Sequence, residues 1–154
     1  MIPRIIHYCW FGKGAMPELA LKCIESWKKC LPNYDLHLWN EDNFDVTTAP
    51  RYVQEAYVAK KYAFVSDYVR LWALEREGGV YLDTDVEVIR SFDSLLSDIA
   101  FIGLEESKAL LPGTCVMGCE AHCEWVKDML ATYENATFLK EDGSLDLTTN
   151  VQRL

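Results

Sequence analysis

The sequence lacks a long apolar run. Near the N-terminus, the apolar residues between Ile2 and His7 are interrupted by Pro3 and Arg4. A signal peptide needs a longer apolar core and a small-residue cleavage site, and a membrane span needs about 20 apolar residues. We therefore expect no signal peptide and no transmembrane segment. The predicted location is the cytoplasm, with at most a peripheral association at the inner face of the membrane.

Basic residues are also scarce. The 154 residues include 15 Lys and Arg against 24 Asp and Glu, which gives a formal net charge of -9. A protein that holds nucleic-acid phosphates needs a basic face, so we expect no nucleic-acid partner. The acidic balance suits a site that gathers carboxylates around a divalent cation.

Six cysteines are present, but no export signal accompanies them. Thiols are therefore expected rather than disulfides. Cys115, Cys119, His122 and Cys123 suggest a zinc cluster only weakly, because a zinc-ribbon knuckle pairs two Cys-x2-Cys motifs. Small buried thiols are the preferred interpretation.

Local patterns predict an α/β domain. An opening strand, helix and strand favour a parallel sheet, and the length fits one domain over residues 1–154. Pro17 opens the first helix, and Gly78 with Gly79 ends the long helical stretch. The predicted strands are 5–10, 35–39, 80–83, 86–89 and 100–104; the predicted helices are 17–30, 51–77 with a break near 60–61, and 120–133; a polar tail with a turn at 142–143 follows from 135.

The acidic motif Asp83-Thr84-Asp85 directly follows the apolar strand 80–82. In open α/β sheets, ligands bind at the carboxyl ends of the strands. Two carboxylates at that position can share Mg²⁺ or Mn²⁺, and the cation would stabilise a departing diphosphate. A solvated turn is the alternative interpretation of so short a pattern.

Asp67 and Arg70 form a second charged feature, three residues apart on an apolar helix. They share one helix face, and charges in such surroundings are costly unless paired. One interpretation is a mutual ion pair. The other is a ligand site, with Asp67 accepting from sugar hydroxyls and Arg70 donating to sugar or phosphate oxygens.

Trp10 ends the first predicted strand, where its ring could stack on a nucleobase or belong to the core. His7, inside that strand, is interpreted as a buried histidine with its hydrogen bonds satisfied. The loop 40–43 either reaches a nucleotide or is only a turn. The remaining tryptophans are predicted to be core residues: Trp27, Trp39, Trp72 and Trp125.

Several of these stretches together resemble glycosyltransferase family 32. The opening residues 2–12 are similar to the first strand of that family, and blocks at 26–29, 38–40 and 43–44 follow. The most specific match pairs A-x-x-S-D-x-x-R at 63–70 with G-G-x-Y-x-D-x-D at 78–85. The resemblance covers roughly residues 2–133. The family includes capsular-polysaccharide transferases and the yeast initiating mannosyltransferase, and is related to the glucosyltransferase core of clostridial toxins.

The resemblance implies a GT-A fold, a Rossmann-like mostly parallel sheet flanked by helices, shortened at the C-terminal, acceptor-side part. It implies retaining transfer from a nucleoside diphosphate sugar, preferably a UDP-sugar, to a saccharide or lipid-linked acceptor in polysaccharide or capsule biosynthesis. Asp67, Arg70, Asp83 and Asp85 would form the catalytic set. Trp10 would stack on the base, Asp67 and Arg70 would hold the donor sugar, and Asp83 would contact ribose or sugar. Asp83 and Asp85 would hold Mn²⁺ or Mg²⁺, with Asp85 the direct ligand.

Two alternatives remain open. Without the C-terminal part, the chain could be a non-catalytic sugar-nucleotide-binding remnant or a subunit of a larger assembly. Alternatively, Asp83 and Asp85 would be the nucleophile and general acid of a haloacid-dehalogenase-like phosphatase. Such a strand usually opens the domain, and too little chain follows here for the remaining motifs. The sequence names neither the sugar nor the acceptor, and it does not fix the oligomeric state.

Overall fold

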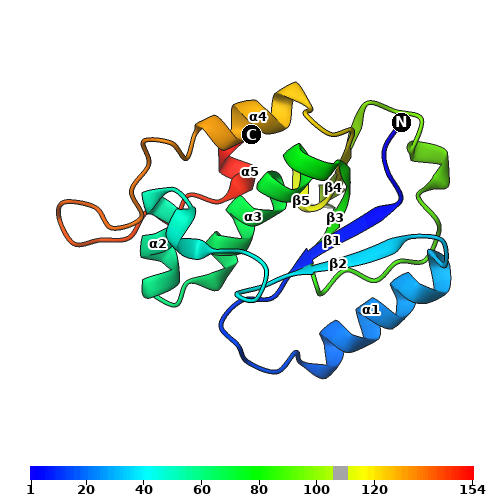
Figure 1. Ribbon diagram of the computed structural model, residues 1–154, viewed down its shortest axis with the longest axis horizontal. Helices are drawn as coiled ribbons and strands as arrows, with labels where there is room; N and C mark the ends of the chain where they lie inside the picture. The colour runs from blue at the N-terminus through cyan, green and yellow to red at the C-terminus, as the bar shows by residue number, and fades with distance from the viewer. Residues whose placement is uncertain (106–110) are drawn as a thin grey trace.

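A computed structural model of the protein describes residues 1–105 and 111–154. The strands of these residues form one sheet in the order β2-β1-β3-β5-β4, flanked by helices (Figure 1). The elements are β1 (Ile5–Cys9), α1 (Glu18–Cys30), β2 (Asp35–Trp39), α2 (Arg51–Val58), α3 (Tyr62–Glu77), β3 (Gly79–Leu82), β4 (Ala100–Glu105), β5 (Leu111–Cys119), α4 (Glu124–Ala131) and α5 (Asn150–Arg153), with short 3-10 turns at Val46–Thr48 and Asp93–Leu95.

The sheet is mixed but mostly of one direction. β1 pairs in parallel with β2 and with β3. β5 pairs antiparallel with both β3 and β4, so it alone among the described strands runs the opposite way. The predicted α/β fold with a mostly parallel sheet is therefore confirmed, and the reversed strand lies directly beside the strand that carries the acidic motif.

Two apolar layers cover the two faces of the sheet. Because side chains alternate along a strand, Val80 and Leu82 of β3 pack on the face covered by α1, whereas Tyr81 packs on the opposite face. That opposite face is covered by α2, α3 and α4, as the ribbon view also shows (Figure 1). All four residues of β3 are buried, so this strand is the centre of the molecule.

Two glycines turn the chain from α3 directly into β3. Gly78 has φ 64° and its N–H bonds to the Leu74 carbonyl, which ends the helix. Gly79 has φ 106°, and a Cβ there would lie 2.8 Å from the Ile5 carbonyl oxygen. Only glycine adopts this conformation cheaply at such close backbone approach. The predicted helix end at these residues is confirmed.

The strand predicted at 86–89 is wrong. This segment has no strand partner, and side chains of α1 satisfy its backbone instead. Trp27 Nε1 donates to the Val86 carbonyl at 2.7 Å, and the Val88 N–H donates to Ser26 Oγ at 2.9 Å. The backbone of residues 86–89 is therefore bonded to a helix rather than to a sheet.

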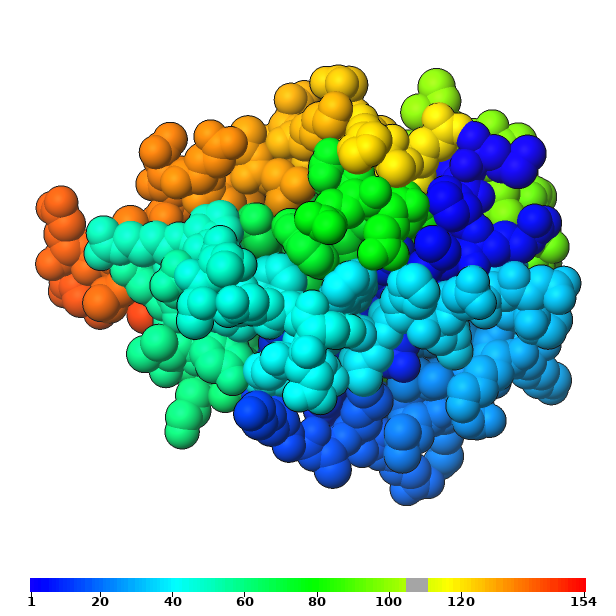
Figure 2. All heavy atoms as spheres, viewed as in Figure 1, coloured from blue at the N-terminus to red at the C-terminus, as the bar shows by residue number. Residues whose placement is uncertain are grey.

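The C-terminal third differs most from the expectation. β5 was not predicted, and the helix expected from 120 begins at Glu124. The turn at 142–143 is confirmed, with Gly143 at φ 82°. The polar tail then returns and ends in α5, which was not predicted and which lies against α3 (Figure 1). In the space-filling view the tail lies at one end of the molecule beside α2 (Figure 2).

Among the described residues, no helix has both the length and the apolar character that crossing a bilayer requires. All six cysteines lie within the described residues and are present as thiols, as predicted.

Candidate functional site

A cleft of about 730 Å³ opens at the carboxyl ends of β1 and β3. Its volume lies within the range of about 300–1,000 Å³ that is typical of small-molecule and cofactor sites. Five residues singled out from the sequence line it together: Trp10, Asp67, Arg70, Asp83 and Asp85. The structure thus brings side chains from β1, α3 and the end of β3 into one cavity.

Arg70 is the centre of the polar wall. Its Nη2 lies 3.1 Å from Asp67 Oδ1 and 3.0 Å from Asp83 Oδ1, and its side chain is only 6% exposed. Its Nη1 donates to the Thr114 carbonyl at 2.7 Å, and its guanidinium carbon lies 4.4 Å from the centre of the Tyr81 ring. The predicted Asp67–Arg70 ion pair therefore exists, it includes Asp83 as well, and it lies in the wall of the cleft.

Burial and pairing act in opposite directions on these charges. Burial disfavours the charge of Arg70, but the neighbouring acids Tyr81, Asp83 and Asp67 raise its pKa above the usual value, so it stays protonated. Burial raises the pKa of Asp67, although Arg70 and a backbone N–H from Asn150 oppose the change. The stabilisation of the Asp67 charge therefore comes from Arg70 and the Asn150 N–H rather than from water.

The two carboxylates of the acidic motif differ sharply. Asp83 accepts the Tyr81 hydroxyl at 2.9 Å on the oxygen that faces Arg70, and its N–H bonds to the Cys115 carbonyl at 2.9 Å. Asp85 is exposed, and no side chain among the described residues bonds to it. The motif is a turn, closed by the Val86 N–H on the Asp83 carbonyl at 3.1 Å. It nevertheless presents one fixed and one open carboxylate to the cleft.

Trp10 also lines the cleft. It is half-buried, and its Nε1 donates to the Gly14 carbonyl at 2.7 Å, which fixes the ring. The loop 40–43 is not part of the cleft lining. Asn40 and Asn43 bond within their own turn, and Glu41 accepts the Gly12 N–H at 2.6 Å. This geometry supports the turn interpretation, with the loop bracing the glycine-containing segment that follows β1.

His7 is fully buried and has its hydrogen bonds satisfied, as predicted. Its Nε2 lies 2.8 Å from the Gly78 carbonyl, which requires a proton on that nitrogen, and Trp39 Nε1 donates to its Nδ1 at 3.1 Å. Burial lowers the pKa of His7, so the ring is neutral. His7, His37 and Glu77 lie close enough to share a metal ion. Because both ring nitrogens of His7 already have partners, this cluster has no third ligand.

The weak zinc pattern does not form a metal centre. In the described residues, Cys115, Cys119, His122 and Cys123 do not make a group of three ligands. His122 pairs with Glu75 at 2.9 Å, and burial raises the pKa of Cys119 to about 12. The preferred interpretation of small thiols is supported, with Cys119 and Cys123 buried.

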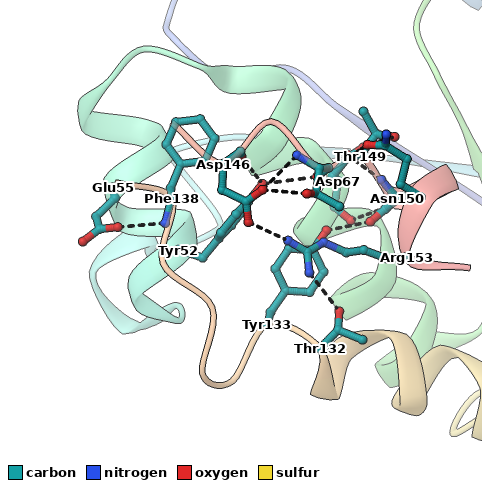
Figure 3. Close-up of polar contacts among 12 residues, drawn as sticks. Tyr52, Glu55, Asp67, Thr132, Tyr133, Phe138, Asp146, Thr149, Asn150 and Arg153 are labelled. Atoms are coloured by element: carbon teal, nitrogen blue, oxygen red, sulfur yellow. Dashed lines mark hydrogen bonds and ion pairs between the residues drawn. The ribbon is translucent and has the colours of Figure 1, made fainter. Parts of the chain in front are cut away.

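Four residues of the site network were not found from the sequence. Tyr81 and Thr114 hold Arg70. The other two are Asn150, which bonds to Asp67, and Tyr133, which bonds to Asn150 (Figure 3). A local signal existed for the start of α5, because Thr149 and Gln152 have capping-box spacing and form that box. That signal predicts a helix but not its contact with Asp67.

Comparison with known proteins places these residues in a family. Residues 17–102, more than half of the chain, match the family described as "Glycosyltransferase sugar-binding region containing DXD motif". The chain is 33% identical to inositol phosphoceramide mannosyltransferase 3 of Schizosaccharomyces pombe over 108 residues, which are 66% of this chain and 29% of the relative. It is 35% identical to glucan organizing enzyme 1 of Cryptococcus neoformans over 83 residues, which are 49% of this chain and 23% of the relative. The matched residues thus cover less than a third of the length of each of these two relatives.

A solved structure shares the fold. The chain aligns with the PaToxG glycosyltransferase with a TM-score of 0.69 and 22% identity, covering 84% of this chain and 59% of that one. This likeness confirms the predicted GT-A-like architecture. Residues Asp67, Arg70, Asp83 and Asp85 all fall within the matched region 17–102. The chain belongs to the glycosyltransferases whose sugar-binding region contains the DXD motif.

Proposed function

We propose that the cleft binds a nucleoside diphosphate sugar with a divalent cation, and that the sugar is transferred with retention to a saccharide or lipid-linked acceptor. The observation that carries this proposal is the convergence of Trp10, the Asp67–Arg70–Asp83 network and Asp85 on one cavity. An aromatic ring and oriented carboxylates in one cleft suit a ligand that combines a base with a hydroxylated sugar.

The charge of the cleft favours a cation before an anionic ligand can enter. Three carboxylates, Asp67, Asp83 and Asp85, face the single guanidinium of Arg70. In their ionised forms these four groups carry two net negative charges, in a protein whose formal net charge is -9. A diphosphate would be repelled by such a site. A divalent cation offsets the excess, so the affinity for the donor should depend on the metal.

The residues present fit a hard divalent cation. Asp85 has its whole carboxylate open, and Asp83 has one oxygen that is not bonded to Arg70 or Tyr81. Carboxylate oxygens are the ligands that Mg²⁺ and Mn²⁺ prefer, with phosphate oxygens and water completing the shell. Bound there, the cation would neutralise the charge that develops on the diphosphate as the sugar leaves.

The protein side chains supply orientation. Asp67, fixed by Arg70 and Asn150, would accept hydrogen bonds from donor sugar hydroxyls. Arg70 is almost fully buried, so its main part is to hold Asp67 and Asp83 at fixed positions. Trp10, with its ring fixed by Gly14, would stack on the base.

The retaining course rests on the resemblance to glycosyltransferase family 32. Among the described residues, three carboxylates line the cleft: Asp67 and Asp83 are held by Arg70, and Asp85 is assigned to the metal. A covalent glycosyl-enzyme intermediate would need a further carboxylate without such ties. Direct displacement on the face from which the diphosphate leaves is therefore the preferred course.

Titration calorimetry with UDP-glucose and GDP-mannose, each with and without Mn²⁺, tests the binding step. The second donor is included because the Schizosaccharomyces pombe relative is named a mannosyltransferase. We expect binding only with metal, and a loss of at least about 10-fold in affinity for Asp85→Asn. Asp98→Asn removes the same charge from an exposed position outside the cleft and should bind as the unmodified protein does.

Binding that survives chelation, or that Asp85→Asn leaves intact, would sink the metal-dependent site. Release of free sugar or transfer to added oligosaccharide tests catalysis, and tight binding without either would favour a non-catalytic sugar-nucleotide-binding protein. Phosphate release from a generic phosphate ester would favour the phosphatase. That reaction is not expected, because Asp83 Oδ1 is already bonded to Arg70 and Tyr81.

A further inference from the structure

We propose that Asn150 is a positioning residue for Asp67, held in place by Tyr133, so that the C-terminal segment determines how the cleft holds the donor sugar. This inference rests on the proposed function, because it concerns the carboxylate assigned to the donor sugar. Asn150 lies 83 residues after Asp67 in the chain, yet the two residues are in direct contact (Figure 3).

Every polar group of the Asn150 side chain has a partner in this contact. Its Nδ2 donates to the Asp67 carbonyl at 2.7 Å, and its Oδ1 accepts the Tyr133 hydroxyl at 2.6 Å. Its backbone N–H donates to Asp67 Oδ2 at 3.2 Å. The residue is 0% exposed, and Tyr133 is 0% exposed as well. A buried amide whose nitrogen and oxygen each have a partner is held in place, since movement would leave a buried polar group unpaired.

Asp67 is therefore held from two sides. Arg70 fixes Oδ1 at 3.1 Å, and the Asn150 N–H fixes Oδ2 at 3.2 Å. Two bonds on different oxygens set the plane of a carboxylate, whereas one bond leaves it free to rotate. The remaining lone pairs of Asp67 line the cleft, so their direction depends on Asn150.

The segment that carries Asn150 is anchored outside the cleft. Arg153, with a side chain 10% exposed, lies between two rings, its guanidinium carbon 4.4 Å from the centre of Tyr133 and 5.1 Å from that of Tyr52. Its Nη2 lies 3.6 Å from Asp146 Oδ2. The Glu55 carboxylate accepts two backbone N–H groups at the start of the tail, those of Phe138 and Leu139 (Figure 3). These contacts hold α5 and the tail to α2 and to the segment that follows α4.

The inference predicts a selective defect. Replacing Asn150 by Ala keeps its backbone N–H but removes the side-chain bonds to the Asp67 carbonyl and to Tyr133, which hold that N–H against Asp67 Oδ2. The change should therefore disturb the sugar end of the cleft, where Asp67 lies, and leave the metal and diphosphate end intact. Thr149 and Val151, the neighbours of Asn150, line the same cleft. A variant at Asn150 should therefore bind a nucleoside diphosphate normally and bind the corresponding nucleoside diphosphate sugar poorly.

Calorimetry with Mn²⁺ on UDP, UDP-glucose, GDP and GDP-mannose measures this difference. For the donor that binds, Asn150→Ala should weaken the sugar nucleotide by about 10-fold or more and change the nucleoside diphosphate by less than about 2-fold. Tyr133→Phe keeps the ring and removes only the hydroxyl that holds Asn150, so it should show the same pattern at about 3-fold or more. Tyr34→Phe is the matched control, because it removes a hydroxyl bonded to Asp93 at 2.9 Å in the other apolar layer, and should change neither affinity.

A double-mutant cycle with Asp67→Asn separates positioning from general damage. If Asn150 acts through Asp67, then Asn150→Ala should add little to the loss of sugar-nucleotide affinity already caused by Asp67→Asn. Additive losses, or equal losses for the sugar nucleotide and the diphosphate, would overturn the inference. So would unchanged affinities in both Asn150→Ala and Tyr133→Phe. If the unmodified protein binds no sugar nucleotide, or binds it no better than the diphosphate, the proposed function or the sugar-contact role of Asp67 fails instead. The positioning role of Asn150 is then refuted as well.

Discussion

Replacing Arg70 by Met tests whether the guanidinium holds the cleft together. The change keeps an unbranched apolar side chain but removes every donor, together with the guanidinium that lies over the Tyr81 ring. It strands Asp67, whose side chain is 13% exposed, and Asp83, whose side chain is 32% exposed. Removing one partner of a buried ion pair costs about 3–5 kcal/mol. Because water reaches Asp83, we expect the lower end, about 3 kcal/mol of unfolding free energy.

A second substitution identifies the source of that loss. Burial raises the pKa of Asp67, which means that its charge is tolerated only through its partners. In Arg70→Met, the further change Asp67→Asn removes the stranded charge and should restore about 1–2 kcal/mol. The same Asp67→Asn change in the presence of Arg70 should restore nothing, so the two substitutions should be strongly coupled.

Urea unfolding followed by tryptophan fluorescence measures these free energies, since the chain contains five tryptophans. The dependence on urea should stay the same in all variants if only native contacts change. A loss below about 1 kcal/mol for Arg70→Met would refute the reasoning from buried pairing. A double variant as unstable as Arg70→Met alone would show that the stranded carboxylate is not the cause.

Three further substitutions test the frame around the site. Burial lowers the pKa of His7 from 6.5, so on acidification the unfolded chain binds a proton before the native protein does, and the free energy of unfolding falls as the pH drops from about 7 to about 5. His7→Gln cannot titrate, so its melting temperature should fall less over this pH range. An equal fall in the variant and the unmodified protein would contradict this. Gly79→Ala should lower the free energy of unfolding in urea by about 2–4 kcal/mol, because its Cβ would lie 2.8 Å from a backbone oxygen at φ 106°. The control Gly14→Ala has open space around it, so its free energy of unfolding should stay within about 0.5 kcal/mol of that of the unmodified protein. Ser26→Ala should cost about 1 kcal/mol by leaving the buried Val88 N–H unpaired, and no change in the urea midpoint would mean that another acceptor replaces it.

The first half of the fold could be predicted from the sequence because its signals are local. The apolar run of β1 and the proline before α1 each act within a few residues, and so do the two glycines after α3. β5 gave no such signal, because Pro112, Gly113 and Gly118 interrupt it. It is a strand because β3 and β4 pair with it on both sides. The segment 86–89 failed for the opposite reason, since its strand-like pattern has no strand to join.

The same distinction applies to the site. Asp67, Arg70, Asp83 and Asp85 could be found from motif spacing, and the structure places them in one cleft with Trp10. Their partners could not be found, because each comes from a distant segment. Thr114 reaches Arg70 across 44 residues, and Asn150 reaches Asp67 across 83. Motifs identify the charged groups, whereas the pairing that fixes their positions depends on the tertiary fold.

The irregular pairing of β5 has a consequence for how the protein tolerates change. Ile102 of β4 pairs with Met117, but the next residue, Gly103, pairs with Gly113. The register of β4 against β5 therefore shifts at residues 114–116, which also contact the site: Thr114 holds Arg70 of α3, and the Cys115 carbonyl accepts the Asp83 N–H. The pairing of β5 with β3 is thus regular, whereas its pairing with β4 contains a register shift. An inserted or deleted residue in β4 should therefore change the pairing at this irregularity, while the pairing of β5 with β3 beside the cleft is kept.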